Sequence, residues 1–127
     1  MSTPDDGAGR SSVSEVGNLE VQGISFDEWI GYHANLSISL CKIDVEGHEA
    51  DVFAGMTQTL AQSRIPAFIF ERHGPTKDDP VFEMLRRHGY VIRRITKGLQ
   101  RVRYESIDAP NVGRPTSDFI ATTKGQE

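Results

Sequence analysis

The sequence has a single cysteine, no long apolar run and no excess of positive charge. Cys41 is the only cysteine among 127 residues, so neither an intramolecular disulfide nor an all-cysteine metal site can form. Because it lies in an apolar stretch, we expect it to behave as a small buried hydrophobe. No stretch approaches the ~18 apolar residues of a membrane span, and the amino terminus lacks a basic-then-apolar signal. We therefore expect a soluble, cytoplasmic protein.

The charge balance is mildly acidic, with 14 Lys and Arg against 18 Asp and Glu and a net charge of −4. This balance gives no electrostatic reason to expect nucleic acid or an anionic membrane as the main partner. Basic residues do gather between positions 86 and 103, where they could form a basic patch. The solvated faces of strands and helices have a similar composition, and we favour that interpretation. The length suggests one domain with a modest core.

The first part of the chain has little to bury. Residues 1–18 are rich in Ser, Gly and Asp and nearly free of large apolar side chains, which predicts a flexible tail. Apolar and polar residues then alternate over 19–24, as in a short, half-exposed strand. Ser25 is suited to cap a short helix that has Asp27 and Glu28 in its first turn.

The middle of the chain predicts a strand, a helix and a second strand. Residues 38–45 form an apolar run that Gly47 ends, and 49–62 carry apolar residues on one face of a helix. Gly55 lies inside this helix and either breaks it or allows close packing. Residues 67–71 form the next apolar run. Such a unit has a right-handed crossover and two parallel strands, and runs that are apolar on both faces suit a sheet covered by helices.

A second helix has clear boundaries. Asp79 can cap it, Pro80 fits its first position, and Gly89 fits the residue just beyond its end. Three further strands are predicted at residues 90–95, 100–104 and 118–122, the first two joined by a tight turn at 97–98.

Residues 42–55 (Lys-Ile-Asp-Val-Glu-Gly-His-Glu-Ala-Asp-Val-Phe-Ala-Gly) resemble the signature of the FkbM family of methyltransferases. In that family, a strand with a similar ending leads through glutamate and glycine into a helix. Other segments follow in the family's order, at residues 21–27, 67–73, 85–95 and 118–122, with Phe26 where the family has leucine. The resemblance covers residues 19–123, which we interpret as one methyltransferase-like domain between tails at 1–18 and 124–127.

The resemblance implies an α/β fold, namely a partial Rossmann-like methyltransferase sheet with flanking helices. The full sheet has strands in the order three, two, one, four, five, seven, six, and residues 38–122 would supply strands four to seven. We expect these strands to be mostly parallel, with an antiparallel last strand. Related enzymes bind S-adenosylmethionine through a glycine-rich turn after strand one and an acid ending strand two, and neither occurs before Leu19. The chain thus resembles a carboxyl-terminal half, incomplete as an enzyme by itself.

Strand four would then be an edge strand with unpaired backbone groups. Residues 38–43 contain little edge protection beyond Lys42. We expect this edge to pair with a missing half, with a second copy of the chain, or with the amino-terminal segment. An alternative function is therefore a non-catalytic remnant or interaction module that pairs through strand 38–45.

The family resemblance implies S-adenosylmethionine-dependent methyl transfer to a hydroxyl of a sugar or secondary-metabolite acceptor. Asp44, Glu71 and His73 are the candidate catalytic residues, since they follow neighbouring strands at the edge where ligands bind. A histidine can remove a hydroxyl proton. Asp44 and Glu46 are the candidate cofactor-binding residues.

Each of these residues also has a purely structural explanation. Asp44, Glu46 and Glu49 precede or begin a helix, whose amino terminus favours negative charge. Glu71 and His73 could belong to a solvated loop, and we expect His48 to be a surface histidine. A third interpretation is a divalent-cation site, formed by Asp44, Glu46, Glu71 and His73.

Overall fold

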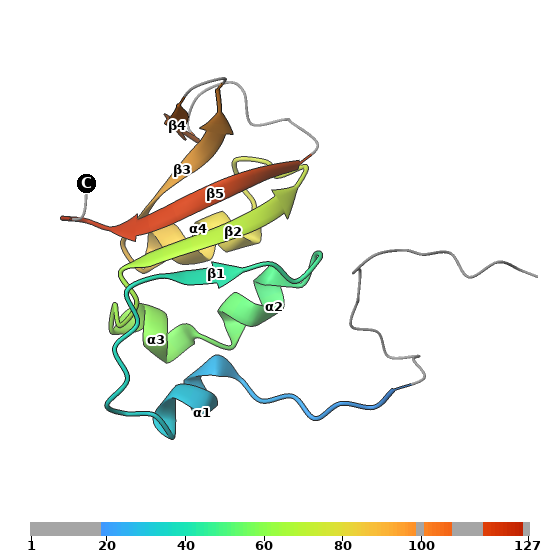
Figure 1. The fold of residues 1–127 in the computed structure, drawn as a ribbon, viewed down its shortest axis with the longest axis vertical. Coiled ribbons are helices and arrows are strands. Elements are labelled where there is room, and N and C mark those ends of the chain that lie inside the picture. Colours follow the sequence, from blue (N-terminus) through green and yellow to red (C-terminus); the bar gives the residue numbers. More distant parts are fainter. Residues whose placement is uncertain (1–18, 99–100, 108–115, 126–127) are drawn as a thin grey trace, which may run out of the picture.

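The computed structural model describes residues 19–98, 101–107 and 116–125. They form a mixed α/β fold in which a five-stranded sheet is flanked by helices (Figure 1). The helices are α1 (Phe26–Gly31), α2 (Glu49–Ala54), α3 (Thr57–Ala61) and α4 (Pro80–Arg87). The strands are β1 (Cys41–Ile43), β2 (Ala67–His73), β3 (Tyr90–Lys97), β4 (Val102–Ser106) and β5 (Thr116–Thr123).

The order of the strands in the sheet is β1-β2-β5-β3-β4. Only β1 and β2 are parallel neighbours, because β5 lies between β2 and β3 and is antiparallel to both. β4 is added antiparallel to β3 at the other edge. The prediction of a mostly parallel sheet was therefore wrong. The strands β1, β2 and β3 do run in one direction, but the insertion of β5 makes most neighbouring pairs antiparallel.

Two predicted strands differ from the structure. Residues 19–24 form no strand, and the side chains of Leu19 and Val21 are 81% and 71% exposed. No described strand pairs with this segment, and an alternating pattern is stable as a strand only beside a partner. The predicted strand 38–45 is reduced to Cys41–Ile43, the three residues that have register partners in β2. Cys41 is half-buried, and burial raises the pKa of its thiol.

The helix boundaries follow the predicted capping residues. The Ser25 Oγ accepts a hydrogen bond from the Glu28 N–H at 3.1 Å, which caps α1. Asp79 Oδ1 accepts from the Val81 N–H at 2.9 Å, and Pro80 is the first residue of α4. Gly89 follows α4 with a φ of +83°, in the left-handed region that glycine adopts readily. These predictions are confirmed.

Gly55 divides the predicted helix over 49–62 into α2 and α3. It also lies close to the start of α1, because a Cβ atom at this position would be 3.4 Å from the Cβ of Ser25. The sequence predicted that Gly55 would either break the helix or allow close packing. In the structure it does both.

The core lies between one face of the sheet and helices α2, α3 and α4. Every second residue of β2 points into it, and so do the facing residues of β5 and the apolar faces of the helices. Its aromatic members are in edge or stacked contact, with ring centroids 4.8–6.3 Å apart. The aromatic side chains involved are Phe53, Phe68, Phe70, Phe82, Tyr90 and Phe119.

Some predictions fall partly or wholly outside the described residues. The predicted tail at 1–18 lies outside them, as do residue 100 of the predicted strand 100–104 and residues 126–127 of the predicted tail at 124–127. The Gly98 N–H donates to the carbonyl of Arg101 at 2.9 Å, closing the connection between β3 and β4. Within the described part of the chain, no helix is long and apolar enough to span a membrane.

Candidate functional site

A tight turn connects β1 to α2. The His48 N–H donates to the Val45 carbonyl at 3.3 Å. The φ angles of Glu46 and Gly47 are +48° and +100°, the sign that a type I′ turn requires at its two central positions. Gly47 adopts this conformation without steric cost, whereas Glu46, which is exposed, adopts it at a cost. The predicted turn role of Gly47 is confirmed.

Glu49 braces this turn from inside the protein. Its side chain is only 1% exposed. One carboxylate oxygen accepts from the Gly47 N–H at 3.1 Å, and the other accepts from Arg72 Nη1 at 3.2 Å. Glu49 therefore fixes the shape of the turn, and its position in the first turn of α2 also places its charge at a favourable helix end.

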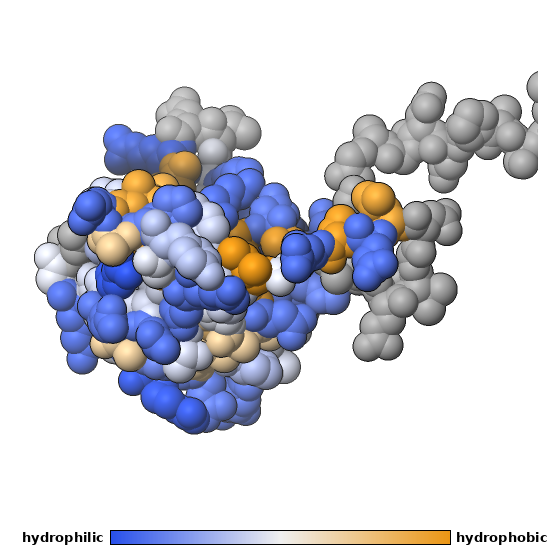
Figure 2. Space-filling view, turned by 90° about the horizontal axis from the view of Figure 1, so that it is seen from below, coloured by the Kyte–Doolittle hydropathy of each residue, from blue (hydrophilic) through white to orange (hydrophobic). Residues whose placement is uncertain are grey.

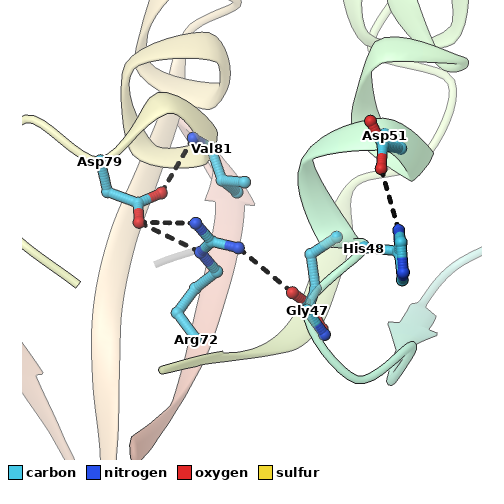
Figure 3. Close-up of polar contacts among 7 residues, drawn as sticks. Gly47, His48, Asp51, Arg72, Asp79 and Val81 are labelled. Carbon is cyan, nitrogen blue, oxygen red and sulfur yellow. Dashed lines mark hydrogen bonds and ion pairs between the residues drawn. The ribbon is translucent and has the colours of Figure 1, made fainter. Parts of the chain in front are cut away.

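Arg72 joins three elements through one guanidinium group (Figure 3). Its Nε and Nη2 atoms donate to Asp79 Oδ2 at 3.1 and 2.8 Å. The side chains of Arg72 and Asp79 are 15% and 6% exposed. One largely buried cation thus balances two buried carboxylates, Glu49 and Asp79, and backbone N–H groups satisfy the remaining oxygens. The network connects the β1–α2 turn, the end of β2 and the start of α4.

The two predicted cofactor-binding residues lie on the surface. Asp44 directly follows β1 and forms an ion pair with Lys42 at 3.1 Å, in which the two side chains are 48% and 68% exposed. Glu46 is exposed at the tip of the turn. The cofactor-binding role of Asp44 and Glu46 stays a prediction.

The predicted catalytic residues follow or end neighbouring strands. Asp44 and Glu71 come directly after Ile43 and Phe70, which are register partners in the parallel pair β1 and β2. Because side chains alternate along a strand, Glu71 lies on the face of β2 opposite to the core-facing Phe70. Glu71 is half-buried and is the register partner of Asp118 in β5.

His73, the third predicted catalytic residue, ends β2 and is exposed. The cation-site interpretation receives no support from the described residues. Among them, no group of three or more His, Cys, Asp or Glu side chains is arranged to hold a metal ion.

A groove of about 590 Å³ lies beside the turn, between the start of α1 and α2. We call it the α1–α2 groove. Figure 2 shows hydrophobic surface gathered where the segment before α1 meets the body of the molecule. The residues that line the groove are Gly23, Ile24, Ser25, Phe26, Trp29, Val45, His48, Asp51, Val52 and Gly55.

His48 and Asp51 form the polar part of the groove. His48 Nδ1 lies 3.1 Å from Asp51 Oδ2, and the two side chains are 39% and 83% exposed. In the neutral imidazole, this contact places the proton on Nδ1 and leaves Nε2 as an acceptor. Figure 3 shows the other ring nitrogen directed away from Asp51. The groove therefore has mostly apolar walls and, beside the Asp51 carboxylate, an imidazole nitrogen oriented as a hydrogen-bond acceptor.

Sequence reasoning missed Arg72 and Asp51. Arg72 shares a strand face with Phe68 and Phe70, so a charge at this core-facing position was a usable signal for a buried partner. Asp51 follows His48 by three residues, a spacing that places two helical side chains together.

Comparison with known protein families gives a match over most of the chain. A family model described as the methyltransferase FkbM domain matches residues 2–92. The matched region contains the turn, Glu49, Arg72, Asp79 and every residue of the α1–α2 groove. It begins within the segment that we predicted as a tail and ends in β3. No curated protein and no solved structure matches the chain.

Proposed function

The chain belongs to the FkbM methyltransferase family, and from this premise we propose that it takes part in methyl transfer from S-adenosylmethionine to an acceptor hydroxyl. One observation carries the proposal. The signature segment 42–55 forms the end of β1, the braced turn and α2, and it contributes one wall of the α1–α2 groove. Ligands of open α/β sheets bind at the carboxyl ends of such strands.

The order of the strands supports a relation to the seven-stranded methyltransferase sheet. The observed sequence of neighbours β1, β2, β5 and β3 is the one that strands four, five, seven and six would have. We propose this correspondence, in which β1 is strand four. The free side of β1 would then face the position of strand one.

S-adenosylmethionine supplies the methyl group when it is bound, but the described residues do not fit it as a complete site. Asp44 and Glu46 are exposed, and neither lines the α1–α2 groove. A glycine-rich turn for the cofactor would have to follow a strand that comes before β1. The described part of the chain contains no such strand, so it places no such turn beside Asp44 and Glu46. In this proposal the chain by itself is therefore incomplete as an enzyme, and no step through the cofactor follows from its geometry.

The proposed roles of the strand-end residues concern the acceptor. Asp44 and Glu71 accept hydrogen bonds from acceptor hydroxyls, and His73 removes the proton from the hydroxyl that becomes methylated. The partner is a small molecule. Neither nucleic acid nor a membrane is part of the proposal.

The test is a titration of the isolated chain with S-adenosylmethionine, followed by amide signals in two-dimensional NMR. We expect weak, millimolar binding, with signal changes centred on residues 44–49 and reduced further in Asp44→Ala. The matched control is Asp78→Ala, because Asp78 is an exposed acid outside the signature segment. Tight binding would contradict the incompleteness of the site. Signal changes that avoid residues 44–49 would contradict the role of the signature segment.

A second candidate function is an interaction module that pairs through the edge strand. The supporting observation is that β1 is the outermost strand of the described sheet and is preceded by the exposed side chains of Leu36 and Leu40. An outer strand presents unpaired backbone groups to another chain.

A further inference from the structure

We propose that the α1–α2 groove binds a small, neutral, largely apolar molecule, and that His48 accepts a hydrogen bond from a hydroxyl of this molecule. Asp44, Glu71 and His73, to which the proposed function assigns the methyl acceptor, do not line this groove, so the inference adds a second ligand site and goes beyond the proposed function. The binding itself follows from the groove and does not need the methyl transfer.

The size and the walls of the groove select an apolar ligand. Its volume of about 590 Å³ falls within the ~300–1,000 Å³ typical of small-molecule sites. Phe26 and Trp29 form one wall, with ring centroids 5.5 Å apart. Val45 and Val52 form the other wall, and Ile24 lies at the mouth with 54% of its surface exposed. A ligand ring placed here would remove apolar surface from water on both sides.

The charges around the groove exclude an anion. No Lys or Arg is among the described residues that line it, and the acidic side chain of Asp51 is part of its wall. A carboxylate or phosphate would lose its hydration without gaining a cationic partner. Asp51 already contacts His48, so its carboxylate serves to orient the imidazole. These charges favour a neutral ligand.

His48 supplies the specific contact. Because Asp51 holds Nδ1 at 3.1 Å, the neutral ring has Nε2 available as an acceptor. A hydroxyl is a neutral group that donates to such a nitrogen. The hydroxyl proton would then be held at Nε2 and the ligand oxygen would be oriented at the rim of the groove, next to the turn of the signature segment.

Trp29 provides a direct measurement of binding. It is the only tryptophan of the chain, so its indole N–H gives a single NMR signal that reports the groove wall. We would titrate the full chain with 4-ethylphenol, with ethylbenzene, which lacks the hydroxyl, and with 4-ethylbenzoate, which is an anion. We expect 4-ethylphenol to bind about fivefold more tightly than ethylbenzene, the worth of one hydrogen bond. We expect 4-ethylbenzoate to bind most weakly.

Two variants make the result specific. His48→Phe keeps an apolar ring but removes the acceptor, so the preference for 4-ethylphenol over ethylbenzene should fall to about one while ethylbenzene still binds. Ile24→Asp should weaken all three probes. Its matched control is Val21→Asp, since Val21 is 71% exposed in the same segment and does not line the groove. Val21→Asp should bind like the wild type.

The outcomes separate this inference from the proposed function, because the titration contains no S-adenosylmethionine. No change of the Trp29 signal with 4-ethylphenol, or a preference for 4-ethylphenol that persists in His48→Phe, would overturn the inference. Equal weakening by Ile24→Asp and Val21→Asp would overturn it as well. The probes could bind as expected while S-adenosylmethionine changes no NMR signal of residues 44–49. This result would support the inference and contradict the proposed function.

Discussion

The guanidinium of Arg72 makes both of its hydrogen bonds with Asp79 to the same carboxylate oxygen, at 2.8 and 3.1 Å. This arrangement leaves Asp79 Oδ1 to accept from the Val81 N–H, and it leaves Arg72 Nη1 to donate to Glu49. The amino-terminal cap of α4 and the brace of the signature turn therefore depend on one side chain. The geometry of the candidate site therefore depends on the contacts of Arg72 with Asp79 and Glu49.

Replacing Arg72 should destabilise the fold strongly. Arg72→Met keeps a similar apolar length but leaves Glu49 and Asp79 buried without their cation. Removal of one partner from a buried ion pair costs about 3–5 kcal/mol. We expect a loss of this size in the free energy of unfolding, measured by urea denaturation at pH 7.

The matched control is Arg87→Met. Arg87 lies 3.8 Å from Glu83 on the surface of α4, and its side chain is 74% exposed. Exposed ion pairs contribute little to stability, so this variant should unfold near the wild-type midpoint. Similar midpoints for Arg72→Met and Arg87→Met would show that the buried network does not support the fold.

The signature turn should require glycine at position 47. Gly47→Ala forces a Cβ atom into the left-handed region, at a cost of about 1–2 kcal/mol. Glu46→Asn should leave stability little changed, because Asn tolerates this conformation better than other side chains. Gly31→Ala is the control, since Gly31 ends α1 without a positive φ and has open space around the added Cβ. Thermal unfolding checks the series, and a Gly47→Ala variant as stable as Gly31→Ala would contradict the prediction.

Asp27 should make stability depend on pH in the acidic range. Partial burial would raise the pKa of its carboxyl, but hydrogen bonds from the Thr59 hydroxyl and from the N–H groups of Gln58 and Thr59 outweigh this and lower the pKa. A carboxyl whose pKa is lower in the folded state contributes stability at pH values above its unfolded-state pKa. This contribution is lost as the pH falls through its folded-state pKa. Through these hydrogen bonds of 2.7–2.9 Å, the Asp27 side chain of α1 caps the amino terminus of α3.

Asp27→Asn should therefore cost about 1 kcal/mol at pH 7, as the loss of a helix cap does. Its difference from the wild type should shrink as the pH falls below the ordinary value of 3.8. Urea denaturation between pH 7 and pH 2.5 measures this difference. The exposed Glu28 on the same helix gives the control Glu28→Gln, which should remain near the wild type at pH 7. A difference for Asp27→Asn that stays constant down to pH 2.5 would be incompatible with a lowered pKa.

Local signals predicted much of the fold, whereas interactions between distant residues were missed. Ser25, Asp79 and Gly89 determine helix ends through hydrogen bonds or backbone conformation within a few residues, and a sequence displays such signals directly. The position of β5 between β2 and β3 depends on which strands meet in space, so the expected strand order came from the family resemblance and not from any local pattern. The failure of 19–24 to form a strand has the same origin, because alternation does not supply a partner.

The candidate site shows the same division between local and distant signals. Gly47 was predicted as a turn residue from the sequence around it. The burial of Glu49 depends on Arg72, which lies 23 residues away, and no local pattern connects them. The groove wall requires the start of α1 to lie beside the end of α2, where the Asp27 N–H donates to the Gly55 carbonyl and the Asp27 carboxylate accepts from the N–H groups of α3.

The edge of the sheet should allow the chain to associate with itself if β1 pairs with a second copy. Among the described strands, β1 has one neighbour, β2, and none of them pairs with its other side. The exposed side chain of Lys42 on β1 protects this edge in part, since a charged residue opposes pairing with another chain. We expect a monomer–dimer equilibrium that depends on protein concentration, measured by sedimentation velocity.

A charge next to the open strand should shift this equilibrium toward the monomer. Leu40 directly precedes β1 and is 52% exposed, so Leu40→Lys would place a second ammonium group at the edge. Leu36 is 45% exposed but further from the strand, and Leu36→Lys should leave the dimer intact. Asp44→Ala should also leave it intact, because backbone pairing does not use the Asp44 carboxylate. A dimer that survives Leu40→Lys, or dissociates in Asp44→Ala, would show that the contact lies elsewhere.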